Sequence, residues 1–258
     1  MGNNFSNLCN TCMKSTKAPE IVLIDNPEKV KQPMESAPLI IRGFNTTDVQ
    51  SKLEDAKQEF LNLINEGIEG GDCEIVVDNP DCKVSGKETS DGYLVKYQFK
   101  MPYEPEALLS FLQKLEKRPV WDKNVFSSER IAQLDPSTCI IRTIYKKQWA
   151  ISSRENLIAC KKAKIGEAIA DFSTSVESEE LPVQNDYVRV KLFVGGYYYE
   201  PIEKDENGNI TLVTSISHLD IGMTNVMNKL ARKLTSTGVP KFVKTLMAEL
   251  KKDLEEAK

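Results

Sequence analysis

Two consecutive segments, DYVRVKLFVGGYYYEPI (186–202) and ITLVTSISHLDI (210–221), decide the fold of this chain. Each is rich in β-branched and aromatic residues, and each exceeds the roughly five or six residues of an average strand. Four further β-prone segments precede them: SERIAQL, TCIIRTIYKKQWAI, RENLIACKKAK and EAIADFSTSVE. Such a succession of long strands that alternate on one face predicts one strongly curved antiparallel sheet.

Helical segments lie around the predicted sheet. TTDVQSKLEDAKQEFLNLINEG (46–67) carries apolar residues at helical spacing, and EPEALLSFLQKLEKR (104–118) has its leucines on one side. Three short β-prone runs lie between these two helices. A final helix is predicted from about Thr224 to Glu256. A curved sheet tends to close over such a terminal helix, which leaves either a ligand cavity or a filled core between them.

Composition limits the class of protein. The chain has 258 residues and a net charge of -4, which fits one domain with a tail and argues against general nucleic-acid binding. No run approaches the ~18 apolar residues of a membrane span, and no secretory signal is present, so we expect a cytosolic protein. Cysteines are then expected as reduced thiols, with Cys73, Cys82, Cys139 and Cys160 in packing roles.

Four stretches carry an ordered set of motifs. They are VWDKNV (120–125), WAISSRENLIA (149–159), FSTSVESEELPVQNDYVRVKLFVGGYYYEPI (172–202) and SISHLDIGMTNVMNKLARK (215–233). Together they resemble the START family, the lipid-transfer domains related to steroidogenic acute regulatory protein. The similarity spans roughly residues 47–255, with matching element order. Two positions depart from the family pattern, because Glu155 replaces Asp and Met223-Thr224 replaces Ile-Pro.

The resemblance implies an α+β helix-grip fold, in which a curved antiparallel sheet wraps around the long C-terminal helix and an internal cavity holds one lipid. Residues 1–45 are then a mostly irregular tether, within which two apolar patches, IVLI (21–24) and LII (39–41), are expected to dock on the body, and residues 46–258 are the START-type domain. The ligand would be a sterol, phospholipid or sphingolipid, exchanged when a lid opens at the membrane. Each buried CH₂ group is worth about 0.8 kcal/mol, so a lipid monomer in water needs such an enclosed apolar site.

The candidate lipid contacts are aromatic, charged and apolar side chains. They are Trp121, Arg142, Arg154, Glu155, Tyr198, His218, Val226, Leu230 and Leu234. A buried guanidinium requires a carboxylate or phosphate partner, so Arg154 is either part of a structural ion pair or a headgroup anchor. Arg142 has the same two interpretations, besides a solvated outer face. The aromatic and last-helix residues are core residues by default, and they line the tunnel if the helix is loosely held.

Catalytic chemistry has few candidates. His218 is the only histidine, and it shares a strand face with Asp220 while Ser217 points the other way, so the three do not form a relay. For His218, a structural hydrogen bond and a contact with a lipid headgroup both remain open. No Gly-rich phosphate loop or metal-ligand cluster occurs, so we expect no enzyme, no metal and no cofactor.

The first residues, MGNNFSNLCNTC (1–12), contain a lipidation signal. MGNNFS satisfies the Met-Gly-x-x-x-Ser/Thr pattern, which predicts N-myristoylation at Gly2. One myristoyl chain holds a membrane only marginally, and Cys9 and Cys12 are placed to receive palmitoyl groups as the second signal. The CxxC spacing also fits half of a zinc site or a redox pair, although no second pair follows nearby and no strand precedes it. An uninformative tail is the remaining interpretation.

These patterns together predict a monomeric, non-enzymatic lipid carrier on the cytoplasmic face of a membrane, held there by its acyl groups, with part of the protein free in the cytosol. Its expected partners are the lipid and the membrane surface, and not nucleic acid. The alternative is a membrane-tethered lipid sensor or scaffold that regulates a partner protein, and an enzyme on the same fold comes third. A carrier would move lipid between vesicles, a sensor would only bind it, and an enzyme would change it covalently.

Overall fold

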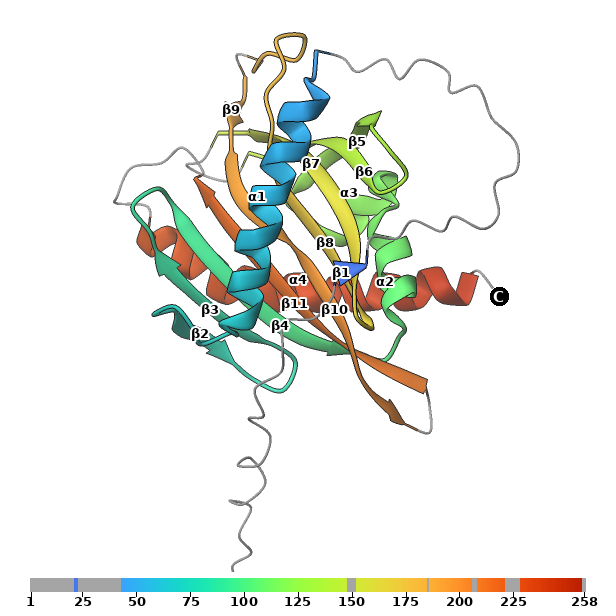
Figure 1. The fold of residues 1–258 in the computed structure, drawn as a ribbon. Helices are drawn as coiled ribbons and strands as arrows, with labels where there is room; N and C mark the ends of the chain where they lie inside the picture. The colour runs from blue at the N-terminus through green and yellow to red at the C-terminus, as the bar shows by residue number, and fades with distance from the viewer. Residues whose placement is uncertain are drawn as a thin grey trace, which may run out of the picture.

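A computed structural model gives the arrangement of the chain (Figure 1). It describes residues 21–22, 43–147, 152–184, 186–205, 208–220 and 228–256, without the side chains of residues 21–22, 203–205, 208–209 and 228–234. None of the helices within these ranges is long and apolar enough to cross a membrane.

One antiparallel sheet forms the body of the molecule, in the strand order β2-β3-β4-β11-β10-β8-β7-β6-β5. The strands are β2 (Glu74–Asp78), β3 (Lys83–Glu88), β4 (Tyr93–Met101), β5 (Val125–Gln133), β6 (Thr138–Tyr145), β7 (Arg154–Ile165), β8 (Ala168–Ser175), β10 (Lys191–Asp205) and β11 (Gly208–Asp220). Short β1 (Ile21–Val22) and β9 (Val188–Arg189) pair with the two ends of β7. The long hairpin of β10 and β11 lies in the middle of this order.

Helices cover both faces of the sheet (Figure 1). They are α1 (Thr46–Asn65), α2 (Pro105–Leu112), the 3₁₀ turn η1 (Leu115–Lys117), α3 (Arg118–Trp121) and α4 (Asn228–Glu256). α1 contacts β7, β8, β10 and β11 on one face, whereas α4 contacts β2, β3 and β4 on the other. The sheet curves around α4, and this arrangement confirms the predicted helix-grip architecture.

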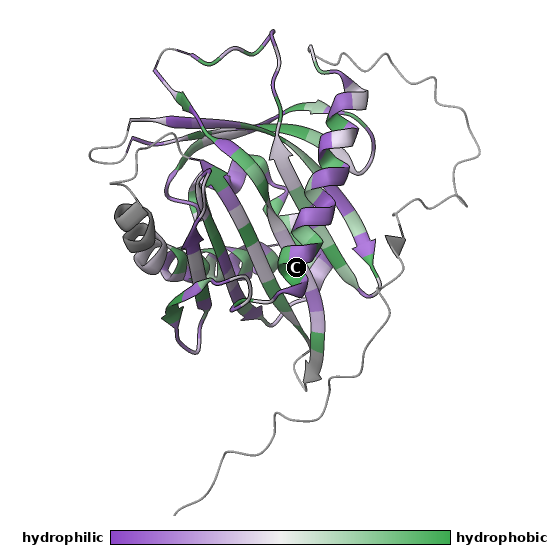
Figure 2. Cartoon of the chain, turned by 60° about the vertical axis from the view of Figure 1, so that its left-hand side comes forward, coloured by the Kyte–Doolittle hydropathy of each residue, from purple (hydrophilic) through white to green (hydrophobic). Residues whose placement is uncertain are grey.

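Two apolar cores result from the alternation of side chains along the strands, which appears as alternating bands in Figure 2. On the outer face, Leu53 and Phe60 of α1 pack with Leu157 of β7 and Phe172 of β8. On the inner face, Leu246 and Leu250 of α4 pack with residues of β4, α2 and α3. Side chains on the outer face of each strand therefore pack toward α1, and only those on the inner face can contact a ligand beside α4.

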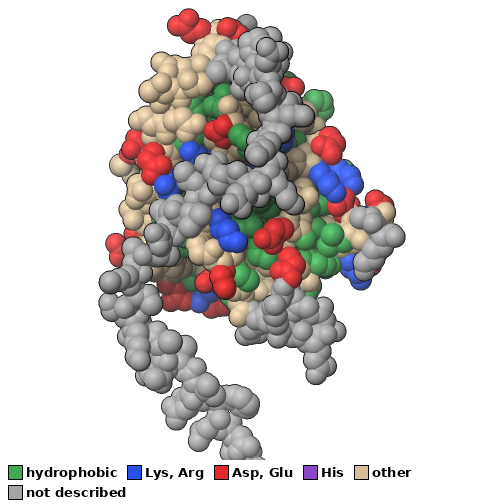
Figure 3. Space-filling view, turned by 45° about the vertical axis from the view of Figure 1, so that its right-hand side comes forward, with side chains coloured by type: hydrophobic (Ala, Val, Ile, Leu, Met, Phe, Trp, Pro, Cys, Tyr) green, Lys and Arg blue, Asp and Glu red, His purple; other side chains and the backbone are tan. Residues whose placement is uncertain are grey.

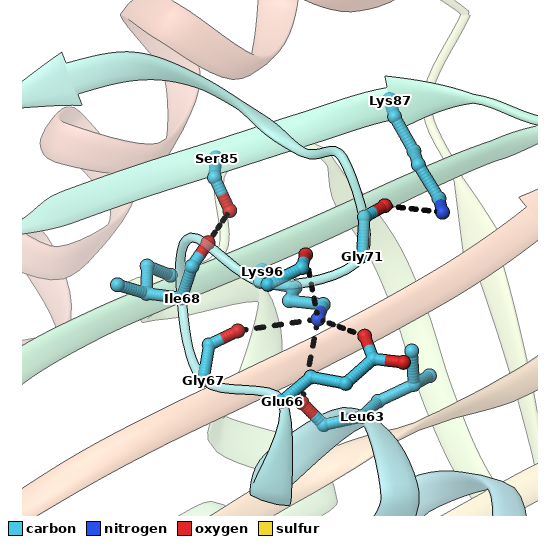
Figure 4. A network of polar contacts seen from close by, with 9 residues as sticks. Leu63, Glu66, Gly67, Ile68, Gly71, Ser85, Lys87 and Lys96 are labelled. Atoms are coloured by element: carbon cyan, nitrogen blue, oxygen red, sulfur yellow. Dashed lines mark hydrogen bonds and ion pairs between the residues drawn. The ribbon is translucent and has the colours of Figure 1, made fainter.

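The end of α1 is fixed to the sheet by a polar network (Figure 4). The fully buried Lys96 of β4 donates to Glu66 at 2.8 Å and to the carbonyl oxygens of Leu63, Gly67 and Gly70 at 3.2 to 3.4 Å. Gly67 ends the helix with a positive φ of 75°, a conformation that suits glycine. A lysine inside the sheet is stable here because it supplies hydrogen bonds to carbonyl groups that the helix end leaves free.

A glycine allows the central strands to come close together. Gly196 of β10 has φ 149°, and a Cβ atom there would lie 2.0 Å from the carbonyl oxygen of Asp171 in β8. Only glycine fits this position. Gly196 in the Gly-Gly-Tyr segment 195–197 therefore allows β10 to lie close to β8, the strand that carries Asp171.

The predicted tether falls mostly outside the described residues, and so does its second apolar patch, LII (39–41). Within it, Ile21 and Val22 pair with Ile165 and Lys164 of β7, which confirms that part of the apolar patch 21–24 docks on the body. The predicted helix 46–67 also corresponds to α1.

Candidate functional site

The sheet, α4 and the α2–α3 segment surround a cavity of about 790 Å³. Every second residue of β7 lines it, from Arg154 to Lys162, because successive side chains of a strand point to opposite faces. Thr235 and Val239 lie on the α4 side. Sites for one small ligand have roughly 300–1,000 Å³, so this space is large enough for a ligand. Of the two alternatives left open by the sequence, the structure therefore has the cavity and not a filled core.

The wall of this cavity is more positive than the chain as a whole. Among the described residues, five basic and two acidic ones line it, although the net charge of the chain is -4. They are Arg118, Arg130, Lys146, Arg154 and Lys162, with Asp122 and Asp171. On the molecular face shown in Figure 3, basic and acidic side chains are interspersed. The described lining of the cavity thus carries an excess of positive charge, which favours an anionic ligand group.

Arg118 is the most distinctive of these charges. It is the first residue of the short helix α3, and its guanidinium lies 5.8 Å from the ring centre of Trp121. Its Nη1 donates to Thr143 at 3.5 Å, whereas its Nε is buried and has no partner. Among the described residues, no carboxylate lies within 4 Å of Arg118. A buried guanidinium in this state has donors to offer to a ligand.

Two carboxyl groups share the cavity with Arg118. Burial raises the pKa of Asp122, although the charge of Arg118 opposes this. Burial also raises the pKa of Asp171 to about 6, against the opposing charges of Lys162 and Arg118. Asp171 therefore changes its charge near neutral pH, within the electrostatic reach of Arg118.

Further polar atoms of the cavity wall lack hydrogen-bond partners. Trp121 Nε1 and Asn156 Oδ1 are both buried and unpaired. Asn156 does use its amide group to donate to the Tyr145 hydroxyl at 3.2 Å. Buried polar groups are normally hydrogen-bonded, so these atoms and the Arg118 Nε mark positions where a polar ligand group would be satisfied.

Two of the predicted lipid contacts do line the cavity. Trp121 is buried at its wall, and Arg154 lies at the start of β7. Arg154 Nη1 donates to the Ser152 carbonyl at 2.7 Å and to the Ser152 hydroxyl at 2.6 Å, and burial lowers its pKa. Val226 and the side chains of Leu230 and Leu234 lie outside what the structure describes, as do Gly2, Cys9 and Cys12.

The predicted lipid contacts of Arg142 and Glu155 are wrong, because neither residue lines the cavity. Glu155 is fully buried on the opposite face of the sheet, where it accepts from Arg142 at 2.7 and 2.9 Å and from Arg189 at 2.8 and 3.1 Å. The reason is the strand alternation, which directs Arg154 inward and Glu155 outward. The acidic residue after Arg154 is thus not its partner, and the buried ion pair of this region is a structural one.

The predicted lipid contacts of Tyr198 and His218 are also wrong, because strand alternation directs both side chains away from the cavity. Tyr198 packs against the outer core beneath α1, while its neighbour Tyr197 lines the cavity. His218 Nε2 lies 3.0 Å from the Thr89 hydroxyl, its ring centre lies 4.7 Å from that of Phe193 with the rings tilted by 38°, and burial lowers its pKa. His218 therefore has the structural role that the sequence left open.

Sequence reasoning missed Arg118, Asp171 and Asn156. Arg118 lies two residues before the motif segment 120–125. A charged residue so close to a motif could have been proposed as a ligand contact. Asp171 is a lone carboxylate in the largely apolar strand β8. For Asn156, nothing in the sequence distinguishes it from the other polar residues of β7.

No cluster of three or more potential metal ligands occurs in the part of the chain that the structure describes. A curved antiparallel sheet around a C-terminal helix, with a ligand-sized cavity between them, is the architecture of a lipid-binding helix-grip domain. The sequence profile of the START domain matches residues 64–256. Because this match covers most of the chain, the protein belongs to the START domain family, whose members bind and transfer lipids.

Solved structures have the same fold. Human StAR-related lipid transfer protein 5 superposes with a TM-score of 0.66 at 20% identity, over 81% of this chain and 99% of that one. Human STARD10 gives 0.60 at 17% identity, over 79% and 80%. The human StarD13 (DLC2) lipid transfer and protein localization domain gives 0.54 at 18%, over 80% and 96%. No curated protein sequence matches this chain. At these identities the likeness concerns the fold, and the ligand has to be inferred from the cavity.

Proposed function

We propose that the domain binds a single lipid with a phosphate headgroup and transfers it at or between membranes without altering it. The observation that carries this proposal is Arg118, a buried guanidinium in the cavity wall with an unpartnered Nε and no carboxylate within 4 Å among the described residues. A guanidinium matches a phosphate because its parallel N–H groups can bind two oxygens together.

The remainder of the wall suits the acyl part of such a lipid. Val95, Ile141, Ile158, Leu192 and Leu219 contribute apolar side chains from five strands. Each CH₂ group that moves from water into such a site gains about 0.8 kcal/mol, so an acyl chain supplies most of the affinity while the headgroup contacts select the lipid class. No residue that lines the cavity is needed as a nucleophile in this cycle, and the lipid leaves as it entered.

The transfer assay tests the role of Arg118 directly. Full-length protein is incubated with donor vesicles that contain a fluorescent phosphatidylcholine and with acceptor vesicles that lack it. We expect Arg118→Met to reduce transfer roughly ten- to hundredfold, because a hydrogen bond to a charged group contributes about 1.5–3 kcal/mol. Lys100→Met, at an exposed position of β4 outside the cavity, is the matched control and should transfer normally. Equal transfer by both variants would refute the headgroup role, and binding without transfer would instead favour a lipid sensor.

Acylation supplies the proposed membrane tether, which places the domain on the cytoplasmic face. Myristoylation at Gly2 would give marginal membrane affinity, and palmitoylation at Cys9 or Cys12 would make the attachment stable. We expect Gly2→Ala to shift the full-length protein from the membrane fraction to the soluble fraction of lysed cells. The variant Asn3→Ala, which keeps the signal, should stay with the membranes. An unchanged distribution of Gly2→Ala would contradict the tether.

A further inference from the structure

Two cysteines face each other in the cavity wall. Cys139 of β6 is the antiparallel register partner of Cys160 of β7, and both line the cavity. Cys139 is 7% exposed and Cys160 is half-buried, and both are free thiols. Lipid binding does not require them, because any pair of small apolar residues would fill the same space. The position of two thiols opposite each other in the cavity wall is therefore not explained by lipid binding.

The backbone geometry allows the two sulfur atoms to be joined. Lys162 N–H donates to the Ser137 carbonyl at 3.1 Å, and these residues continue the same register, so they form a hydrogen-bonded pair. Because such pairs alternate along an antiparallel ladder, Cys139 and Cys160 form the next one, with a typical Cα separation of about 5.5 Å. This value lies within the range of about 4.4–6.8 Å that disulfides require.

The surroundings of the two thiols suit oxidation. Hydrogen bonding from Cys160 lowers the pKa of Cys139, and the positive charges of Arg130 and Lys162 act in the same direction. The same thiol contact, together with burial, raises the pKa of Cys160. One sulfur is therefore the better nucleophile and the other stays protonated beside it, which is the arrangement of an attacking and a resolving cysteine. Since the cavity wall carries both, a small oxidant that enters the cavity reaches them.

We propose that Cys139 and Cys160 form a redox-active dithiol in the cavity wall, which a hydroperoxide oxidises to a disulfide between β6 and β7. The Cys139 sulfur attacks one peroxide oxygen, the O–O bond breaks, and the leaving hydroxide takes up the thiol proton as water. The resulting sulfenic acid is attacked by the Cys160 sulfur, the S–O bond breaks, and the second thiol proton leaves with the oxygen as a second water. Two thiols thus lose two electrons, and one hydrogen peroxide becomes two waters.

Peptide mapping of the oxidised full-length protein tests this proposal. The reduced protein is treated with hydrogen peroxide, blocked with N-ethylmaleimide under denaturing conditions, digested without reductant and analysed by mass spectrometry. We expect one disulfide-linked peptide pair that contains Cys139 and Cys160 and is two hydrogens lighter than the reduced pair. Cys82, which is buried in the inner core, should be recovered with the maleimide label. Recovery of labelled Cys139 and Cys160, or disulfides of Cys9 and Cys12 only, would overturn the proposal.

Single variants assign the two roles. Cys160→Ser should leave Cys139 as a sulfenic acid that dimedone traps, because no resolving thiol is present. Cys139→Ser should slow the loss of thiol at Cys160, since the better nucleophile is gone. Cys82→Ser is the matched control and should form the disulfide as the wild type does. Failure of dimedone to label Cys160→Ser would contradict the assignment of Cys139 as the attacking residue, and the wild-type map remains decisive if a variant does not fold.

Discussion

Arg118 and Asp171 both line the cavity, and the charge of Arg118 acts on the Asp171 carboxyl group. Arg118 keeps its positive charge at every relevant pH, whereas the pKa of Asp171 is raised to about 6 by burial. Above pH 6 the Asp171 carboxylate offsets part of the field of Arg118, and below pH 6 it is neutral. The cavity is therefore more positive at acidic pH, and an anionic headgroup is held more tightly there.

This relation predicts a pH-dependent affinity. A phosphodiester keeps its negative charge throughout this range, so we expect the affinity for phosphatidylcholine to rise several-fold as the pH falls from 7.5 to 5. Asp171→Asn should show the high affinity at both pH values. The exposed variant Asp81→Asn should retain the wild-type profile. Titration with a fluorescent phospholipid at the two pH values measures the effect, and a wild-type affinity that falls toward pH 5 would contradict it.

At the scale of single residues, the sequence predicted the kinds of side chain better than their directions. Arg154 and Glu155 are neighbours in the chain, and the sequence made both of them candidate lipid contacts. A strand places them on opposite faces, so Arg154 lines the cavity while Glu155 pairs with Arg142 and Arg189. Which face is the inner one depends on where α4 lies, and no pattern within β7 contains that information.

At the scale of elements, the buried Lys96 joins α1 to the sheet. Its ammonium group satisfies three carbonyl oxygens and the Glu66 carboxylate at the C-terminal end of the helix. The side chains of Ser85 and Lys87 fix the same loop by donating to the carbonyl groups of Ile68 and Gly71 (Figure 4). The outer helix is therefore anchored at one end by polar contacts and along its length by Leu53 and Phe60.

Replacing this lysine should destabilise the fold. We expect Lys96→Met to lower the free energy of unfolding by about 3 kcal/mol, because it leaves three carbonyl groups at the end of α1 without their hydrogen-bond donor and removes the partner of the Glu66 carboxylate. Lys100→Met, on the same strand but exposed, should change it by less than about 0.5 kcal/mol. Urea unfolding followed by circular dichroism gives both values. Equal stability of the two variants would show that the network contributes nothing.

The helices show what the sequence pattern can and cannot define. The segment 46–67 was predicted as a helix and forms α1, because its apolar residues keep one helical period. The predicted helix 104–118 is instead divided into α2, η1 and α3, with a non-helical residue at Lys114. Leucine spacing is unchanged across this break, so periodicity does not reveal it. Arg118, which lines the cavity, lies after this break, at the start of α3.

At the scale of the whole molecule, the helix-grip fold was predictable and the cavity was not. Long alternating strands and a terminal amphipathic helix define the architecture, but a filled interior produces the same apolar pattern. Whether the interior is a cavity or a filled core depends on the separation between α4 and the strands β6, β7 and β8. This separation is set by tertiary packing. α4 packs closely on β2, β3 and β4, and the cavity lies toward the other strands.

The proposed function requires that this cavity holds one lipid with a phosphate headgroup. Native mass spectrometry of the full-length protein, purified from cells without detergent, tests it most directly, with extraction and identification of the bound molecule. We expect one phospholipid per protein, and loss of that species in Arg118→Met but not in Lys100→Met. An empty protein that takes up no phospholipid from vesicles, or a stoichiometric neutral sterol, would contradict it.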